Sequence, residues 1–174
     1  MCKYCGSLIK AIDAYIKKAD DDLTDELEEQ GYAETKKTVE YIQDIEDGVA
    51  EALLEEADYI LSEAEKAIDL ETFAEDVWPG VKLNDELKEK LITVFVENFE
   101  KFMPEFVGYY IAQIDRDLKL IQISKRTIAW IEEWAEELGE IMKLNSHKEI
   151  EGILNKGLKN GDGIATFTQN ILDS

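Results

Sequence analysis

Cys2 and Cys5 form a C-x-x-C pair, the spacing found in zinc knuckles and in thiol redox sites. A structural zinc site needs four ligands, and His147 is the one histidine of the chain. A redox role needs the pair at a junction between a strand and a helix, and no strand is predicted before it. We therefore expect no metal or redox role within a single chain. A zinc site shared by two chains is the alternative for Cys2 and Cys5.

The abundant carboxylates raise the question of a metal-dependent enzyme. A di-iron bundle uses two Glu-x-x-His motifs, which one histidine cannot supply. His147 follows Ser146 in a Ser-x-x-Glu capping box, so we interpret it as a surface residue at the start of a helix. The chain has no nucleophile elbow, no phosphate-binding loop and no calcium-binding loop. We expect no catalytic residue and no cofactor, and metal analysis of the purified protein tests the metalloenzyme alternative.

The acidity of the chain is concentrated in one segment. Residues 20–76 carry 22 Asp and Glu against three lysines, a net charge of −19 out of −21 for the whole chain. Such a surface repels phosphate and attracts basic proteins at long range. We expect this segment to bind a basic protein through carboxylates such as Glu51, Glu55 and Asp58, and not to bind nucleic acid directly. Two alternatives are ordinary hydration of helices and a DNA mimic that occupies the nucleic-acid channel of a host enzyme.

Composition indicates a folded, non-membrane protein. The 174 residues include 45% hydrophobic and 9% aromatic residues, enough to bury a core. No apolar run approaches the roughly 20 residues that span a bilayer, and the N-terminus lacks the apolar region of a signal peptide. We expect synthesis and residence in the cytosol.

The first half of the chain reads as helices. Apolar residues from Leu8 to Ile16 recur at helical spacing, and we expect this short helix to end at the acidic run 20–22. Residues 34–68 predict one long helix, or two joined near Gly48. The Pro79-Gly80 pair is a turn signal and the predicted boundary between the two halves.

The second half has its own start and stop signals. Asn84 is a predicted N-cap, and Pro104 is expected to break, kink or restart the helix that follows. Ser124 and Ser146 are predicted caps of two later helices. The Gly161-Asp162-Gly163 run is expected to close one helix and open the last.

These patterns predict an all-α fold, an elongated arrangement of five to seven long amphipathic helices without a sheet. The expected domains are an acidic helical arm, residues 1–78, and a packed helical region, residues 79–174, or one continuous domain. Trp130 and Trp134 lie one turn apart on one face of a predicted helix. They fit either anchors for a partner or a core ridge packed on the helix of Phe95, Phe99 and Phe102.

Several short stretches together resemble the phage head morphogenesis family, which is related to the Mu minor head protein and occurs in phages and prophages of Gram-positive bacteria. The stretches that carry the resemblance are 124–127 (SKRT), 130–134 (WIEEW), 146–150 (SHKEI), 157–164 (GLKNGDGI), 1–5 (MCKYC) and 73–80 (FAEDVWPG). Family members usually continue into an Arg-rich segment that this chain lacks, so it resembles an N-terminal portion.

The resemblance implies a minor head (minor capsid) protein that is added in few copies near the portal vertex and acts in head assembly or DNA delivery. It implies partners among virion proteins, such as portal or capsid protein or another copy of the chain, and no catalytic residues. The implied locations are the cytoplasm of the bacterial host during assembly and the virion. The main alternative function is the acidic DNA mimic or anti-defence inhibitor.

Overall fold

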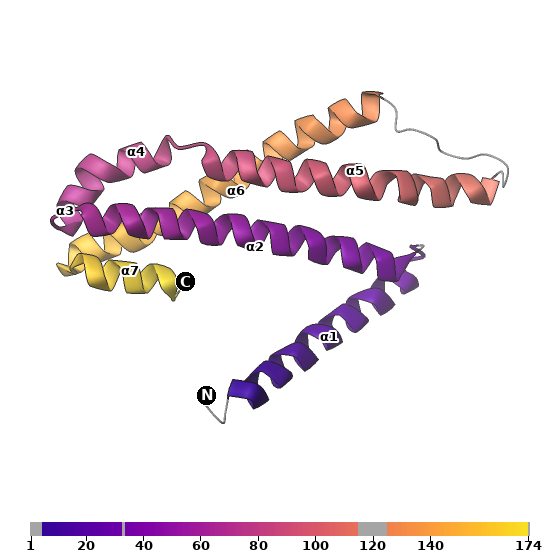
Figure 1. The fold of residues 1–174 in the computed structure, drawn as a ribbon, viewed down its shortest axis with the longest axis horizontal. Helices are drawn as coiled ribbons and strands as arrows, with labels where there is room; N and C mark the ends of the chain where they lie inside the picture. Colours follow the sequence, from indigo (N-terminus) through magenta and orange to yellow (C-terminus); the bar gives the residue numbers. More distant parts are fainter. Residues whose placement is uncertain (1–4, 33, 115–124, 174) are drawn as a thin grey trace. The chain divides into compact units, whose positions relative to one another are not determined.

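The computed structural model describes residues 5–32, 34–114 and 125–173, with side chains described from residue 17 onward. Within these residues the fold is all-α and contains no strand, as predicted (Figure 1). The elements are α1 (Cys5–Glu29), α2 (Thr35–Lys66), α3 (Leu70–Thr72), a π-helical turn (Phe73–Val77), α4 (Trp78–Lys82), α5 (Glu86–Ile114), α6 (Lys125–Asn160) and α7 (Ile164–Leu172).

The described chain divides into two compact units. Unit 1 contains the residues up to Asp44 together with Phe102 to Ile114, and unit 2 contains Ile45–Lys101 together with the residues from Lys125 onward. This differs from the expected division after residue 78. Trp78 and Val81, on either side of that boundary, are both buried in the same hydrophobic cluster of unit 2.

Unit 1 joins α1 to the beginning of α2 and contains the end of α5. The predicted end of α1 at the acidic run is wrong, because the helix continues to Glu29. It stops where Gly31 adopts a φ of +82°, with the Tyr32 amide bonded to the Leu27 carbonyl and the Gly31 amide to the Glu28 carbonyl. These two bonds form a Schellman motif, which ends the helix because amides beyond it bond to its last carbonyls. The run of aspartates provides no such bonds.

α2 is a single helix that passes through Gly48, the first of the two predicted alternatives. Gly48 permits a close approach to α5, since a Cβ there would lie 2.7 Å from Val94 Cγ1. α5 begins as predicted, with Asn84 Oδ1 accepting a hydrogen bond from the Glu86 amide at 3.0 Å. The predicted break or restart at Pro104 is wrong, because α5 continues through it to Ile114.

The segment between α2 and α5 is mostly helical, and one face of it is buried in the core of unit 2. Asp69 caps α3 by accepting a hydrogen bond from the Thr72 amide at 2.8 Å, and this contact lowers the pKa of the Asp69 carboxyl. The π-helical turn and α4 then place Phe73 and Trp78 in the core. The Pro79-Gly80 pair therefore lies inside a short helix that covers unit 2.

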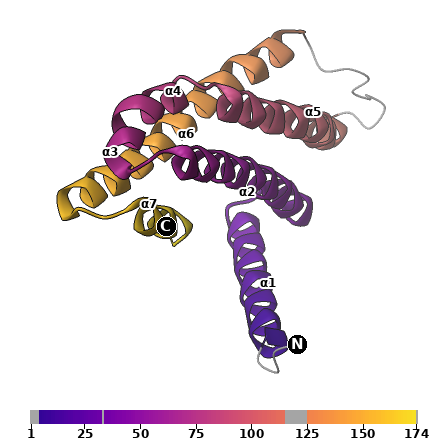
Figure 2. The same cartoon turned by 60° about the vertical axis from the view of Figure 1, so that its left-hand side comes forward.

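α6 is one helix, and the predicted new start at Ser146 is wrong. The Ser-x-x-Glu pattern occurs here inside a helix whose buried residues recur every three or four positions from Ile131 to Gly157. Ser124, the other predicted cap, lies outside the described residues. The predicted turn at residues 161–163 is confirmed, with Gly161 at a φ of +71° in a second Schellman motif. After it, α7 folds back against α6 (Figures 1 and 2).

Unit 2 contains two hydrophobic clusters along α2 and α6. In the first, α3, α4 and α7 pack on these helices around the fully buried Phe73 and Phe167. In the second, α5 packs on them around Leu91 and Ala135. α2 and α6 therefore hold both clusters together.

Candidate functional site

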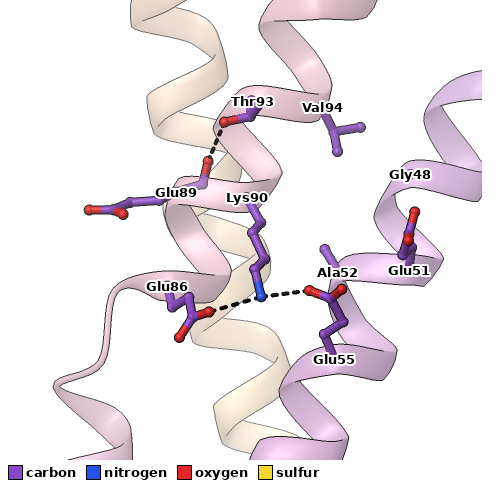
Figure 3. Close-up of a pocket in the computed structure, with 9 residues that line it drawn as sticks. All are labelled: Gly48, Glu51, Ala52, Glu55, Glu86, Glu89, Lys90, Thr93 and Val94. Carbon is purple, nitrogen blue, oxygen red and sulfur yellow. Dashed lines mark hydrogen bonds and ion pairs between the residues drawn. The ribbon is translucent and has the colours of Figure 1, made fainter.

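A groove of about 440 Å³ lies between α2 and α5 in unit 2 (Figure 3). It is lined by Gly48, Glu51, Ala52 and Glu55 from α2 and by Glu86, Glu89, Lys90, Thr93 and Val94 from α5. Ala52 and Val94 supply apolar surface, and four carboxylates surround it. The narrow approach of the helices at Gly48 sets the width of the groove at one end.

Lys90 is the cation of this groove. Its Nζ lies 2.6 Å from Glu55 Oε2 across the groove and 3.0 Å from Glu86 Oε1 one turn earlier on α5. The contact with Glu55, and then that with Glu86, raises the pKa of Lys90 above its ordinary value. The ammonium group is shared by two carboxylates, and both partners are about half exposed. These two exposed ion pairs therefore orient the side chains more than they stabilise the fold.

Glu51 and Glu89 complete the lining without a cation. Neither makes an ion pair within the described part of the chain, and Figure 3 shows no interaction from either side chain to the others drawn. The groove therefore has a net negative charge beside an apolar surface. This arrangement suits a basic side chain with an apolar stem, such as Lys or Arg from another protein. Among the described residues, no three His, Cys, Asp or Glu side chains are placed to hold a metal ion.

The structure brings two of the three predicted interaction carboxylates together. Glu51 and Glu55 are one turn apart on the side of α2 that lines the groove. Asp58 is exposed on the same helix but does not line the groove. Sequence reasoning selected α2 by its charge, whereas the contribution of Glu86, Glu89 and Lys90 from α5 depends on packing.

The two tryptophans have different environments. Trp134 packs edge-on against Phe99 and Phe95, with ring centroids 4.9 and 6.1 Å apart, so it belongs to a core ridge. Trp130 stacks on Trp134 at 6.3 Å but stays 50% exposed, and only this ring is available to a partner. Phe102, expected in the same ridge, instead contacts Tyr41 and Phe106.

A buried polar contact was missed by the sequence analysis. His147 and Glu56 are each 5% exposed, and His147 Nε2 lies 3.1 Å from Glu56 Oε1. The imidazole also lies edge-on to Trp78, with centroids 5.6 Å apart. The interpretation of His147 as a surface residue is wrong because α6 does not restart at Ser146. The helical spacing of His147 with Lys143, Ile150 and Leu154 was the signal that could have found it.

The predicted pair Cys2 and Cys5 lies outside what is described. Cys2 precedes the described residues, and the side chain of Cys5, the first residue of α1, is among those not described.

The chain is similar in sequence to a curated bacterial protein. The chain is 24% identical over 178 aligned positions to an uncharacterized protein, YqbB, of Bacillus subtilis (strain 168). The match covers 95% of this chain and 57% of that protein, so the chain spans little more than half the length of its relative. No protein-family model matches the sequence. No solved structure matches it. In the described residues, no helix is both long and apolar enough to cross a membrane.

Proposed function

We propose that this chain is a structural, non-catalytic protein of phage or prophage head morphogenesis that binds other virion proteins near the portal. Two lines of support meet in this proposal. The sequence resembles minor head proteins in several ordered stretches, and α2, the longest helix of its acidic segment, presents carboxylates in a groove that also has apolar surface. The proposed locations are the bacterial host cytoplasm during assembly and the finished virion.

The observation that carries the proposal is the α2–α5 groove. Glu51 and Glu89 have no cation partner among the described residues, so a basic residue of a partner gains an ion pair without displacing one. Carboxylates of this kind speed encounter with a basic surface and disfavour phosphate, so they favour a protein partner over the packaged genome. The partner is portal protein, capsid protein or another copy of the chain with a basic patch.

The test is co-expression with the portal and capsid proteins of the same phage, followed by co-purification and an affinity measurement at rising salt. We expect binding that weakens as salt rises, because surface ion pairs are screened. The double substitution Glu51→Lys and Glu55→Lys should weaken it by about tenfold or more. The matched control, Asp21→Lys and Asp25→Lys on α1, changes net charge equally and should have an effect below about twofold.

Three results contradict the proposal. They are no binding to either virion protein, binding that does not respond to salt, and equal effects of the two double substitutions. Inhibition of a host DNA-binding enzyme without any binding to virion proteins favours the DNA-mimic function instead.

A further inference from the structure

A second groove, of about 510 Å³, lies between α2, α6 and α7 in unit 2. Its lining is mostly apolar and comprises Leu53, Leu54, Ala57, Met142, Asn145, Ser146, Glu149, Ile150 and Ile171. It shares no lining residue with the α2–α5 groove. No part of the described chain fills it.

The groove lies where the two hydrophobic clusters of unit 2 meet. Leu53 and Met142 belong to the cluster under α5, whereas Ala57, Ile150 and Ile171 belong to the cluster under α7. Leu54, on the α2 rim, is 67% exposed although it lines the groove. Covering this exposed leucine and the apolar floor below it with a partner stabilises the complex by about 25 cal/mol for each Å² of apolar surface buried.

The rims of the groove are acidic. On α2, the exposed carboxylates Glu51 and Asp58 lie one turn to either side of Leu54, and no lysine or arginine occurs between Lys37 and Lys66. On α6, Glu149 lines the groove directly, and Lys148 beside it points about 100° away around the helix. Lys143, also on α6, is buried and pairs with Asp85, so it does not neutralise the rim of the groove.

We propose that this groove is the docking site for an amphipathic helix of a basic partner protein, with apolar residues on one face and Lys or Arg on its flanks. The lining covers about two turns of α6, from Met142 to Ile150, which accommodates apolar anchors at positions i, i+3 or i+4, and i+7 of a bound helix. The apolar anchors cover Leu54 and the floor, and the flanking cations pair with Asp58 and Glu149.

The negative charge of the rims favours a basic partner helix over a second copy of the chain, nucleic acid or an anionic lipid surface. A second copy of the chain brings a formal charge of −21 against the same acidic rims, so self-pairing here is repulsive. Nucleic acids and anionic lipid surfaces are repelled for the same reason. The inference goes beyond the proposed function, because it assigns a second surface and a class of ligand that do not depend on which assembly the protein joins.

The probe is a synthetic 15-residue helical peptide with leucines on one face and lysines on the others, compared with a scrambled peptide of the same composition. We expect the amphipathic peptide to bind at least about tenfold tighter than the scrambled one, because only it presents a continuous apolar face. Backbone amide NMR shifts should concentrate at residues 53–57 and 142–150, and those at residues 86–94 should stay small. The latter group lies in the α2–α5 groove.

Leu54→Asp tests the apolar contact without removing a buried side chain. We expect it to weaken the amphipathic peptide by about tenfold or more, even though it adds a negative charge that favours a basic ligand. Leu144→Asp is the matched control, since Leu144 is similarly exposed but lies on the opposite side of α6 from Met142 and Ser146. It should change the affinity by less than about twofold.

The outcomes separate this inference from its rivals and from the proposed function. Equal binding of both peptides, or shifts centred on the α2–α5 groove, overturns it by showing attraction to charge alone. Self-association of the free protein that Leu54→Asp abolishes also overturns it, because the groove is then covered by a second copy. Since no virion protein takes part in the experiment, failure here leaves the proposed function to its own test.

Discussion

Glu55 and Glu56 are neighbours in the sequence, but one lies at the surface and the other is buried. Glu56 points into unit 2 and hydrogen-bonds the buried His147, whereas Glu55 lines the α2–α5 groove and pairs with Lys90 in solvent. A buried carboxylate without a partner destabilises a protein strongly, while an exposed ion pair contributes little. The acidity of α2 therefore contains two kinds of carboxylate. One kind holds α2 to α6, and the other lines a groove at the surface.

The largest expected effect comes from removing the buried carboxylate. Glu56→Ala should lower the free energy of unfolding by about 3 kcal/mol, because it leaves His147 buried without its partner and opens a cavity. Glu55→Ala should lower it by less than about 1 kcal/mol, since Lys90 keeps Glu86 and water. Urea unfolding at neutral pH measures both.

Glu56→Gln sharpens this test, since an amide keeps a hydrogen bond to the imidazole without the charge. Its loss of stability should fall between those of the two alanine substitutions. Similar losses for Glu55→Ala and Glu56→Ala would show that the distinction between the two faces of α2 is wrong.

A smaller effect is expected at the point where α2 and α5 come closest. Gly48→Val should destabilise unit 2 by about 1–3 kcal/mol, because its Cβ would lie 2.7 Å from Val94 Cγ1. Val94→Ala in the same chain should restore part of that loss. Gly152→Val on α6 is the matched control, because nothing lies within 4 Å of an added Cβ there. If both glycine variants unfold at the same urea concentration, the close approach that narrows the groove is not real.

The smallest effect is expected for the ion pair between Lys143, which is buried, and Asp85, which is exposed. Lys143 is buried on α6, its Nζ lies 2.5 Å from Asp85 Oδ1, and this contact lowers the pKa of the Asp85 carboxyl. A carboxyl whose pKa is lower in the folded state stabilises the fold above its unfolded pKa, about 4, and this stability is lost as the pH falls through the folded pKa. Asp85→Asn should therefore destabilise the protein at pH 7 and have a shrinking effect in acid.

The control for Asp85 is a double-mutant cycle with Lys143→Met. In that background Asp85→Asn should produce a much smaller pH-dependent difference in urea unfolding, since the cation with the largest effect on the Asp85 pKa is gone and only the weaker influence of Lys88 remains. A difference of unchanged size between pH 7 and acid would assign the effect to a group other than Lys143.

Much of the helical architecture could be predicted from local patterns. Helix formers, apolar spacing and the Asn84 and Gly161 caps are properties of a few adjacent residues, so the all-α class, the span of α2 and the start of α5 follow from them. The ends of α1 and the continuity of α5 and α6 did not follow. Acidic runs, Pro104 and the Ser146 capping box are weak local signals, and packing or a stronger cap elsewhere outweighs them.

The candidate site shows where local patterns stop being sufficient. Charge and spacing in the chain identify α2 as an acidic element and select Glu51, Glu55 and Asp58 as candidates, but they do not tell which of the three line the groove. Which carboxylate is buried, which cation reaches Glu55, and which apolar residues remain uncovered depend on contacts between residues far apart in the sequence, such as Glu56 with His147 and Gly48 with Val94. Such contacts exist only after the helices have packed, because the helical period defines the faces of a helix and not the partner of each face.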